Sequence, residues 1–83
     1  MEQLTKYIEI KKLSNPERVF QRLENEFIDI MYPDHFSNSS LIMLLDVGIN
    51  PNREEDIAWL QQLLNTVLPE IGETDYFLIP YTP

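Results

Sequence analysis

Residues 41–46 read LIMLLD, a continuous apolar run that ends on the carboxylate of Asp46. The chain then passes through Asn50 and Pro51, residue types that favour turns. The run predicts a buried strand over residues 41–47 that leads through a loop into a helix. In open α/β sheets ligands bind beyond the carboxyl ends of such strands, so Asp46 marks the first place to look for a site.

The segment before this run predicts a strand and the start of a helix. Residues 5–13 alternate polar and apolar side chains, as a half-exposed strand does. Two assignments of the N-cap residue of this helix are then possible. Either Ser14 caps and Glu17 reaches back, or Asn15 caps and Pro16 takes the first helical position.

An amphipathic helix is predicted next, ending at Tyr32-Pro33 because the residue before a proline disfavours helical geometry. Residues 34–40 are polar and predict a loop before the central strand. The apolar stripe of this helix recurs at helical spacing and consists of Val19, Phe20, Leu23, Phe27, Ile30 and Met31.

The last third of the chain predicts a second helix and a third strand. Asn52 is placed to cap the helix, with Glu55 in position for the reciprocal bond, and Pro69 and Gly72 stop it. Residues 76–79 predict a strand that ends among prolines. The apolar face of the helix consists of Ile57, Leu60, Leu63, Leu64, Val67, Leu68 and Ile71.

Together these elements predict a single small α/β domain over residues 1–83. In the order βαβαβ, we expect a three-stranded, mostly parallel sheet packed with two amphipathic helices. Two arrangements are open. One helix lies on each face of the sheet, or both lie on one face and a partner covers the apolar side chains that the central strand presents on the other.

Charge is distributed unevenly along the 83 residues, whose net charge is −8. The first 22 residues hold five Lys or Arg against three Glu, whereas the remaining 61 hold Arg53 alone against eleven Asp or Glu. This balance argues against nucleic-acid binding and favours a basic protein partner. No membrane span or signal peptide is visible, so we expect a cytoplasmic protein that does not bind membranes.

No catalytic, cofactor-binding or metal-binding motif is present. The chain has no cysteine, which excludes thiolate-bound metal, and its two glycines cannot form a phosphate-binding loop. His35 is the only histidine and is expected to be a surface loop residue. We therefore predict a protein that is not an enzyme and carries no cofactor.

Two families resemble parts of the chain. Residues 41–51 are similar to the strand around the phosphoacceptor aspartate of two-component receiver domains, a comparison that makes Asp46 the acceptor and Thr82 the switch hydroxyl. The acidic pair and the lysine of receivers have no counterpart here, so phosphotransfer is not supported. The small acidic chain with alternating strands and helices resembles barstar-type ribonuclease inhibitors, with residues 32–36 as an echo of their aromatic segment. This resemblance implies an inhibitory or binding role.

The sequence thus predicts a non-enzymatic acidic interaction protein, of inhibitor or immunity type, that docks on a basic protein surface. The alternative is a structural or regulatory subunit that forms a homodimer through an apolar sheet face. Carboxylates between Glu24 and Asp34, with those at positions 54–56, are also candidates for mimicking a phosphate backbone if they share one side of the fold. The candidate partner-binding residues are Asp46, Glu54, Glu55, Asp56, Trp59, Tyr76 and Tyr81.

Overall fold

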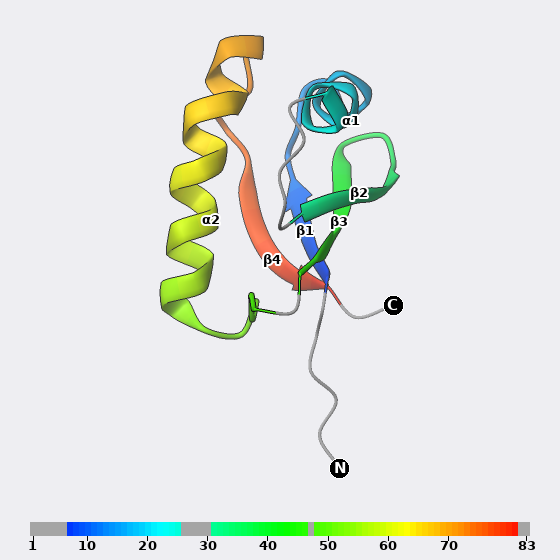
Figure 1. Cartoon of the computed structure of the whole chain (residues 1–83). Coiled ribbons are helices and arrows are strands. Elements are labelled where there is room, and N and C mark those ends of the chain that lie inside the picture. The colour runs from blue at the N-terminus through cyan, green and yellow to red at the C-terminus, as the bar shows by residue number, and fades with distance from the viewer. Residues whose placement is uncertain (1–6, 26–30, 47, 82–83) are drawn as a thin grey trace.

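The computed structural model describes residues 7–25, 31–46 and 48–81 and shows an α/β fold in which a four-stranded sheet packs against two α-helices (Figure 1). None of the described helices is long and apolar enough to cross a membrane. In chain order the elements are β1 (Tyr7–Lys11), α1 (Pro16–Asn25), β2 (Met31–Phe36), β3 (Ser40–Leu45), α2 (Glu54–Val67), the 3₁₀ turn η1 (Leu68–Ile71) and β4 (Phe77–Tyr81).

The predicted three-stranded, mostly parallel sheet is wrong. The sheet has the order β2-β3-β1-β4, and every neighbouring pair of strands is antiparallel. The order β1-α1-β2-β3-α2-β4 is the split βαβ arrangement, in which each helix connects two parallel strands that are not neighbours. The prediction lacked β2, and adding one strand reverses the direction of β3 relative to β1.

Strand β2 occupies the segment predicted as the end of a helix and a polar loop. Its ladder with β3 runs from Met31 opposite Leu45 to Phe36 opposite Leu41, with a bulge between Pro33 and His35. His35 therefore lies on a strand and not in a loop. Of the predicted helical stripe, Met31 belongs to β2, and Phe27 and Ile30 lie outside the described residues.

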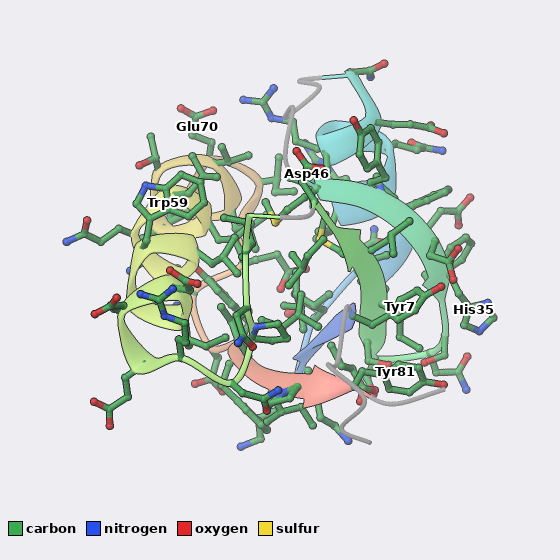
Figure 2. All side chains as sticks on the ribbon, turned by 60° about the horizontal axis from the view of Figure 1, so that its bottom comes forward. Tyr7, His35, Asp46, Trp59, Glu70 and Tyr81 are labelled. Atoms are coloured by element: carbon green, nitrogen blue, oxygen red, sulfur yellow. The ribbon has the colours of Figure 1, made fainter. Side chains whose placement is uncertain are left out.

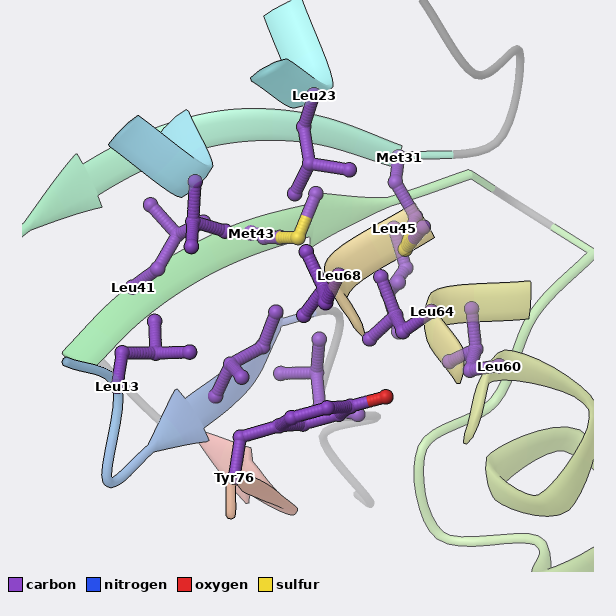
Figure 3. Close-up of a cluster of buried hydrophobic side chains, with 13 residues drawn as sticks. Leu13, Leu23, Met31, Leu41, Met43, Leu45, Leu60, Leu64, Leu68 and Tyr76 are labelled. Atoms are coloured by element: carbon purple, nitrogen blue, oxygen red, sulfur yellow. The ribbon is translucent and has the colours of Figure 1, made fainter. Parts of the chain in front are cut away.

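Both helices cover the same face of the sheet. The buried core joins alternate side chains of β1 and β3 to side chains of both helices, as Figure 3 shows (Ile8, Ile10, Leu13, Val19, Leu23, Met31, Leu41, Met43, Leu45, Leu60, Leu64, Leu68 and Tyr76). The predicted face of α2 is confirmed, because Leu60, Leu64 and Leu68 are buried and the other four side chains pack partly buried against the core. Of the two arrangements left open, the one with a helix on each face is therefore wrong.

The two helix starts differ from each other. Asn15 caps α1, since its Oδ1 accepts a hydrogen bond from the N–H of Arg18 at 3.2 Å, and Pro16 is the first helical residue. The predicted cap at Asn52 is wrong, because α2 begins at Glu54 and its N-cap position, Arg53, makes no side-chain capping bond. Asn52 instead donates its N–H to Asn50 Oδ1 at 2.9 Å within the loop.

The C-terminal end of the helical layer is fastened to α1. The 3₁₀ turn after α2 ends at Gly72, whose φ of 87° lies in the left-handed region. This turn directs the next side chain, Glu73, inward, where it is only 2% exposed. Its carboxylate accepts hydrogen bonds from the backbone N–H groups of Ser14, at 2.8 Å, and Asn15, at 2.7 Å. A carboxylate at a helix start also complements the positive end of the helix dipole.

Candidate functional site

The face of the sheet that the helices leave uncovered is the main candidate. We call it the open face and define it from the strand register, because residues directly opposite each other in a ladder share a face. It consists of Tyr32 and His35 from β2, Ser40, Ile42 and Leu44 from β3, Tyr7, Glu9 and Lys11 from β1, and Phe77, Ile79 and Tyr81 from β4.

Apolar and aromatic side chains dominate the open face. An antiparallel sheet with one solvated face usually alternates apolar residues inward and polar residues outward. Here the outward positions of β4 are Phe77, Ile79 and Tyr81, and β3 contributes Ile42 and Leu44. This departure from alternation is typical of a face that another surface covers.

One row of side chains crosses all four strands of the open face. Tyr32 lies opposite Leu44, Leu44 opposite Tyr7, and Tyr7 opposite Tyr81. The rings of Tyr7 and Tyr81 meet edge to face, with centroids 6.2 Å apart and an interplanar angle of 77°. Tyr81, one of the predicted partner-binding residues, therefore lies in this row.

Exposure on the open face is uneven. Tyr32 is 44% exposed and Phe77 42%, whereas Tyr7, Leu44, Ile79 and Tyr81 are half-buried. Ile42 is only 8% exposed although it lies outside the core cluster. The face thus offers a partly formed apolar layer with aromatic rings at its margin.

The predicted acidic residues at the start of α2 divide into two kinds. Glu54 and Glu55 are exposed, and Glu55 pairs with Arg53. The hydrogen bond to Glu55 and its charge, with a smaller effect of Asp56, raise the pKa of the Arg53 guanidinium. The side chain of Asp56 is 19% exposed, and its Oδ2 accepts the N–H of Asn50 at 2.9 Å. Asp56 therefore holds the loop before α2.

Trp59 lies on the outer side of α2. It is 44% exposed and lines a shallow hollow of about 230 Å³ with Gln62, Leu63 and Thr66. Figure 2 shows it on the opposite side of the molecule from Tyr7, Tyr81 and His35. Because Glu55 lies one helical turn before Trp59, the two side chains share one face of α2, separate from the open face.

The remaining predicted site residues, Asp46 and Tyr76, lie in different environments. Asp46 is exposed at the end of β3, and its carbonyl accepts the N–H of Ile49 at 3.0 Å in a turn. Tyr76 is 9% exposed and belongs to the core (Figure 3). Its hydroxyl donates a hydrogen bond to Asn65 Oδ1. Burial raises the pKa of the Tyr76 hydroxyl, and hydrogen bonding to Gln61 partly offsets this effect. A buried ring cannot anchor a partner at the surface.

The two acidic segments proposed to imitate a phosphate backbone belong to different parts of the molecule. Glu24 lies on α1, which packs over β2 and β3, and Asp34 lies on β2, whereas α2 packs along β4 at the other edge of the sheet (Figure 1). Glu26 and Asp29 lie outside the described residues. Among the residues described, these carboxylates do not form one strip.

A second hollow, of about 380 Å³, lies between α1 and η1. Arg22 and Glu70 both line it, and Arg22 donates a hydrogen bond to Glu70 Oε1 at 2.7 Å. Arg18, Gln21 and Asn25 line the same hollow. The ion pair between Arg22 and Glu70 joins α1 to η1.

In the part of the chain described, no group of three or more acidic or histidine side chains lies close enough together to hold a metal ion. Sequence reasoning included Tyr81 and considered the Ile42 and Leu44 face of the central strand, but it omitted the open-face residues of β1 and most of those of β4, such as Tyr7 and Ile79. Their signal was present as alternation in residues 7–11 and as apolar residues at both sets of positions in β3.

Searches among protein-family models, curated proteins and solved structures found no match for this chain.

Proposed function

We propose that this protein is a non-enzymatic interaction domain that self-associates through the open face of its sheet. The observation that supports the proposal is the placement of both helices on one side, which leaves an apolar and aromatic layer on the other. Fold alone does not specify function, so the proposal rests on this surface.

The two edges of the sheet direct association toward the open face. The edge strands are β2 and β4, and each contains a proline, Pro33 and Pro80 respectively. Proline lacks the N–H that a strand ladder needs, and β2 also carries a bulge, so adding a strand at either edge is disfavoured. Face-to-face packing avoids both obstacles.

Charge favours a second copy of the chain as the occupant of the open face. Among the described residues of this face, one carboxylate, Glu9, is balanced by one ammonium group, Lys11. A face with no excess charge offers little attraction to a strongly basic partner but suits an identical neutral face. The acidic excess of the chain lies elsewhere, as at Glu54 and Glu55 on α2.

The size of the open face sets the expected strength. With about 4.8 Å between strands and about 3.4 Å per residue, the face and its side chains cover at most roughly 400 Å² per copy. Two such faces bury at most roughly 800 Å², which is below the usual range of permanent complexes. We therefore expect a weak dimer whose population rises with protein concentration.

Sedimentation equilibrium between about 10 μM and about 1 mM protein tests the proposal. We expect the mean mass to rise toward that of a dimer, and to do so at both about 0.05 M and about 0.5 M salt, because apolar contacts are not screened. Ile79→Lys and Phe77→Lys should each keep the protein monomeric. Trp59→Lys, which places the same charge on the far side of the molecule, should leave the dimer intact. A monomer at every concentration would overturn the proposal.

A second candidate function is docking of the acidic side of α2 on a basic protein. It is favoured by the exposed Glu54 and Glu55 beside the exposed Trp59. A lysine-rich amphipathic peptide is a suitable probe. Binding that weakens with salt, and that is lost in Glu54→Lys/Glu55→Lys, would support this function. Asp56 is left intact because it holds the preceding loop. No binding of the peptide would oppose this function.

A further inference from the structure

Glu9 lies at the centre of the open face. It is on the inner strand β1, directly opposite Ile42 on β3 and Ile79 on β4. It is half-buried, and within the described part of the chain no hydrogen bond or ion pair involves its side chain. A carboxylate among apolar side chains becomes costly when a second surface displaces its water, unless that surface brings a cation.

Lys11 follows on the same strand and the same face. It lies opposite Ser40 and Phe77, one row beyond Glu9. Two residues along a strand span about 7 Å, and the described structure contains no ion pair between the two side chains. Strand β1 thus presents one acid and one base, each available to a group from outside.

Two-fold symmetry makes this pair complementary to itself. In a symmetric dimer, if residue i of one copy contacts residue j of the other, j also contacts i. A two-fold axis lying between the sheets, perpendicular to β1 and level with Ile10, stacks the two β1 strands antiparallel. Glu9 of each copy then faces Lys11 of the other. An axis parallel to β1 keeps every residue at its own level, so Glu9 would face Glu9, Ile42 or Ile79 of the other copy and meet no cation.

We propose that two copies of this chain pack with their β1 strands antiparallel, so that Glu9 of each copy pairs with Lys11 of the other. This inference rests on the proposed self-association and specifies its geometry. The same arrangement sets Ile79 across from Phe77, which adds apolar contact on the β4 side of the charged pairs. It accounts for a carboxylate among the apolar side chains at the middle of the open face.

Charge reversal tests the energetic part of the proposal. Glu9→Lys or Lys11→Glu alone creates two like-charge contacts and should weaken the homodimer at least about tenfold. An equimolar mixture of the two variants should form a heterodimer, and Glu9→Lys/Lys11→Glu should restore the homodimer. Glu24→Lys and Lys12→Glu make matched charge changes at exposed positions outside the open face and should leave the dimer unchanged. Homodimers of both single variants as tight as the unmodified one would overturn the pairing.

Cysteine cross-linking tests the geometric part, and the absence of native cysteine makes it direct. Glu9→Cys and nitrogen-15-labelled Lys11→Cys are mixed and treated with a thiol-specific bifunctional linker that spans about 10 Å, the distance between stacked sheets, and the label lets intact mass distinguish the products. We expect the mixed 9–11 dimer to dominate over the 9–9 and 11–11 dimers. Dominant 9–9 or 11–11 products, with a dimer still present in solution, would overturn the arrangement but not the self-association. An unmodified protein that stays monomeric would overturn both.

Discussion

Glu73 Oε2 accepts the backbone N–H of Asn15 at 2.7 Å, although the two residues are 58 positions apart in the chain. The second oxygen accepts the N–H of Ser14, so one buried carboxylate satisfies two donors at the start of α1. This contact ties the segment after α2 to the turn between β1 and α1. It explains how a charged residue can lie in the interior without a cation.

Replacing Glu73 should destabilise the fold strongly. Glu73→Ala leaves two backbone N–H groups without their acceptors, and we expect a loss of about 2–4 kcal/mol in the free energy of unfolding. Glu73→Gln keeps one acceptor oxygen and should lose less. Urea denaturation measures both. Glu24→Gln on the exposed side of α1 is the control and should change stability by less than about 0.5 kcal/mol. Equal losses at the two positions would contradict the assigned role of Glu73.

Tyr76 should make stability depend on pH in the alkaline range. Burial raises the pKa of its hydroxyl above the ordinary value of 10.0, so the folded state holds the proton more tightly than the unfolded state. This contribution is complete below the unfolded pKa and is lost as pH rises through the folded pKa. The stability advantage of the unmodified protein over Tyr76→Phe, about 1 kcal/mol near neutrality, should therefore shrink above about pH 10. Urea denaturation from pH 8 to 11 measures it, and a constant difference would contradict the prediction.

The two glycines should respond differently to alanine. Gly72 has a φ of 87°, and a Cβ there would meet no atom within 4 Å, so the cost of Gly72→Ala is conformational alone. We expect a loss of about 1–2 kcal/mol. At Gly48 the space is also open, but φ lies outside the left-handed region, so Gly48→Ala should be neutral or slightly stabilising. Because the space is open at both positions, the difference between the two stability changes measured by thermal unfolding reports the effect of φ.

Asp56 and Glu54 should differ although both are in the first turn of α2. Asp56→Ala removes the acceptor for the N–H of Asn50 and should cost about 1–2 kcal/mol. Glu54→Ala removes only a favourable interaction with the helix dipole, worth about 0.3–1 kcal/mol at low salt. Repeating the measurement in about 0.5 M salt should reduce the Glu54 effect more than the Asp56 effect. A larger reduction by salt for Asp56→Ala than for Glu54→Ala would contradict this prediction and show that Asp56 acts only through its charge.

Much of the secondary structure was predictable, because the signals there are local. The apolar face of α2, the proline at the first position of α1 and the apolar run of β3 each report directly on burial or backbone geometry. Strand β2 was not predictable in this way. Residues 31–36 read MYPDHF, which holds a proline and two polar residues, and Met31 continues the helical spacing of the preceding residues. Pairing with β3 overrides these local preferences.

The error over one strand had consequences across the fold. A strand, a helix and a strand in succession favour parallel pairing, and that inference from the element order was sound for three strands. With β2 present, the hairpin to β3 turns the chain back, and β1 pairs with antiparallel neighbours on both sides. The same missing strand also limited the prediction of the candidate site. The acidic residues and Trp59 were visible in the sequence, whereas the open face depends on which strands are neighbours.

The prolines at the two edges of the sheet also bear on the risk of fibre formation. Residues 41–45 are all apolar and contain no proline, glycine or charge, the composition of segments that stack into cross-β fibres. In the fold, β3 lies between β2 and β1, so both of its backbone edges are paired. The strands that remain at the margins hold Pro33 and Pro80. We therefore expect the fold to oppose fibre formation by keeping this segment in the interior of the sheet, between strands whose prolines disfavour further pairing.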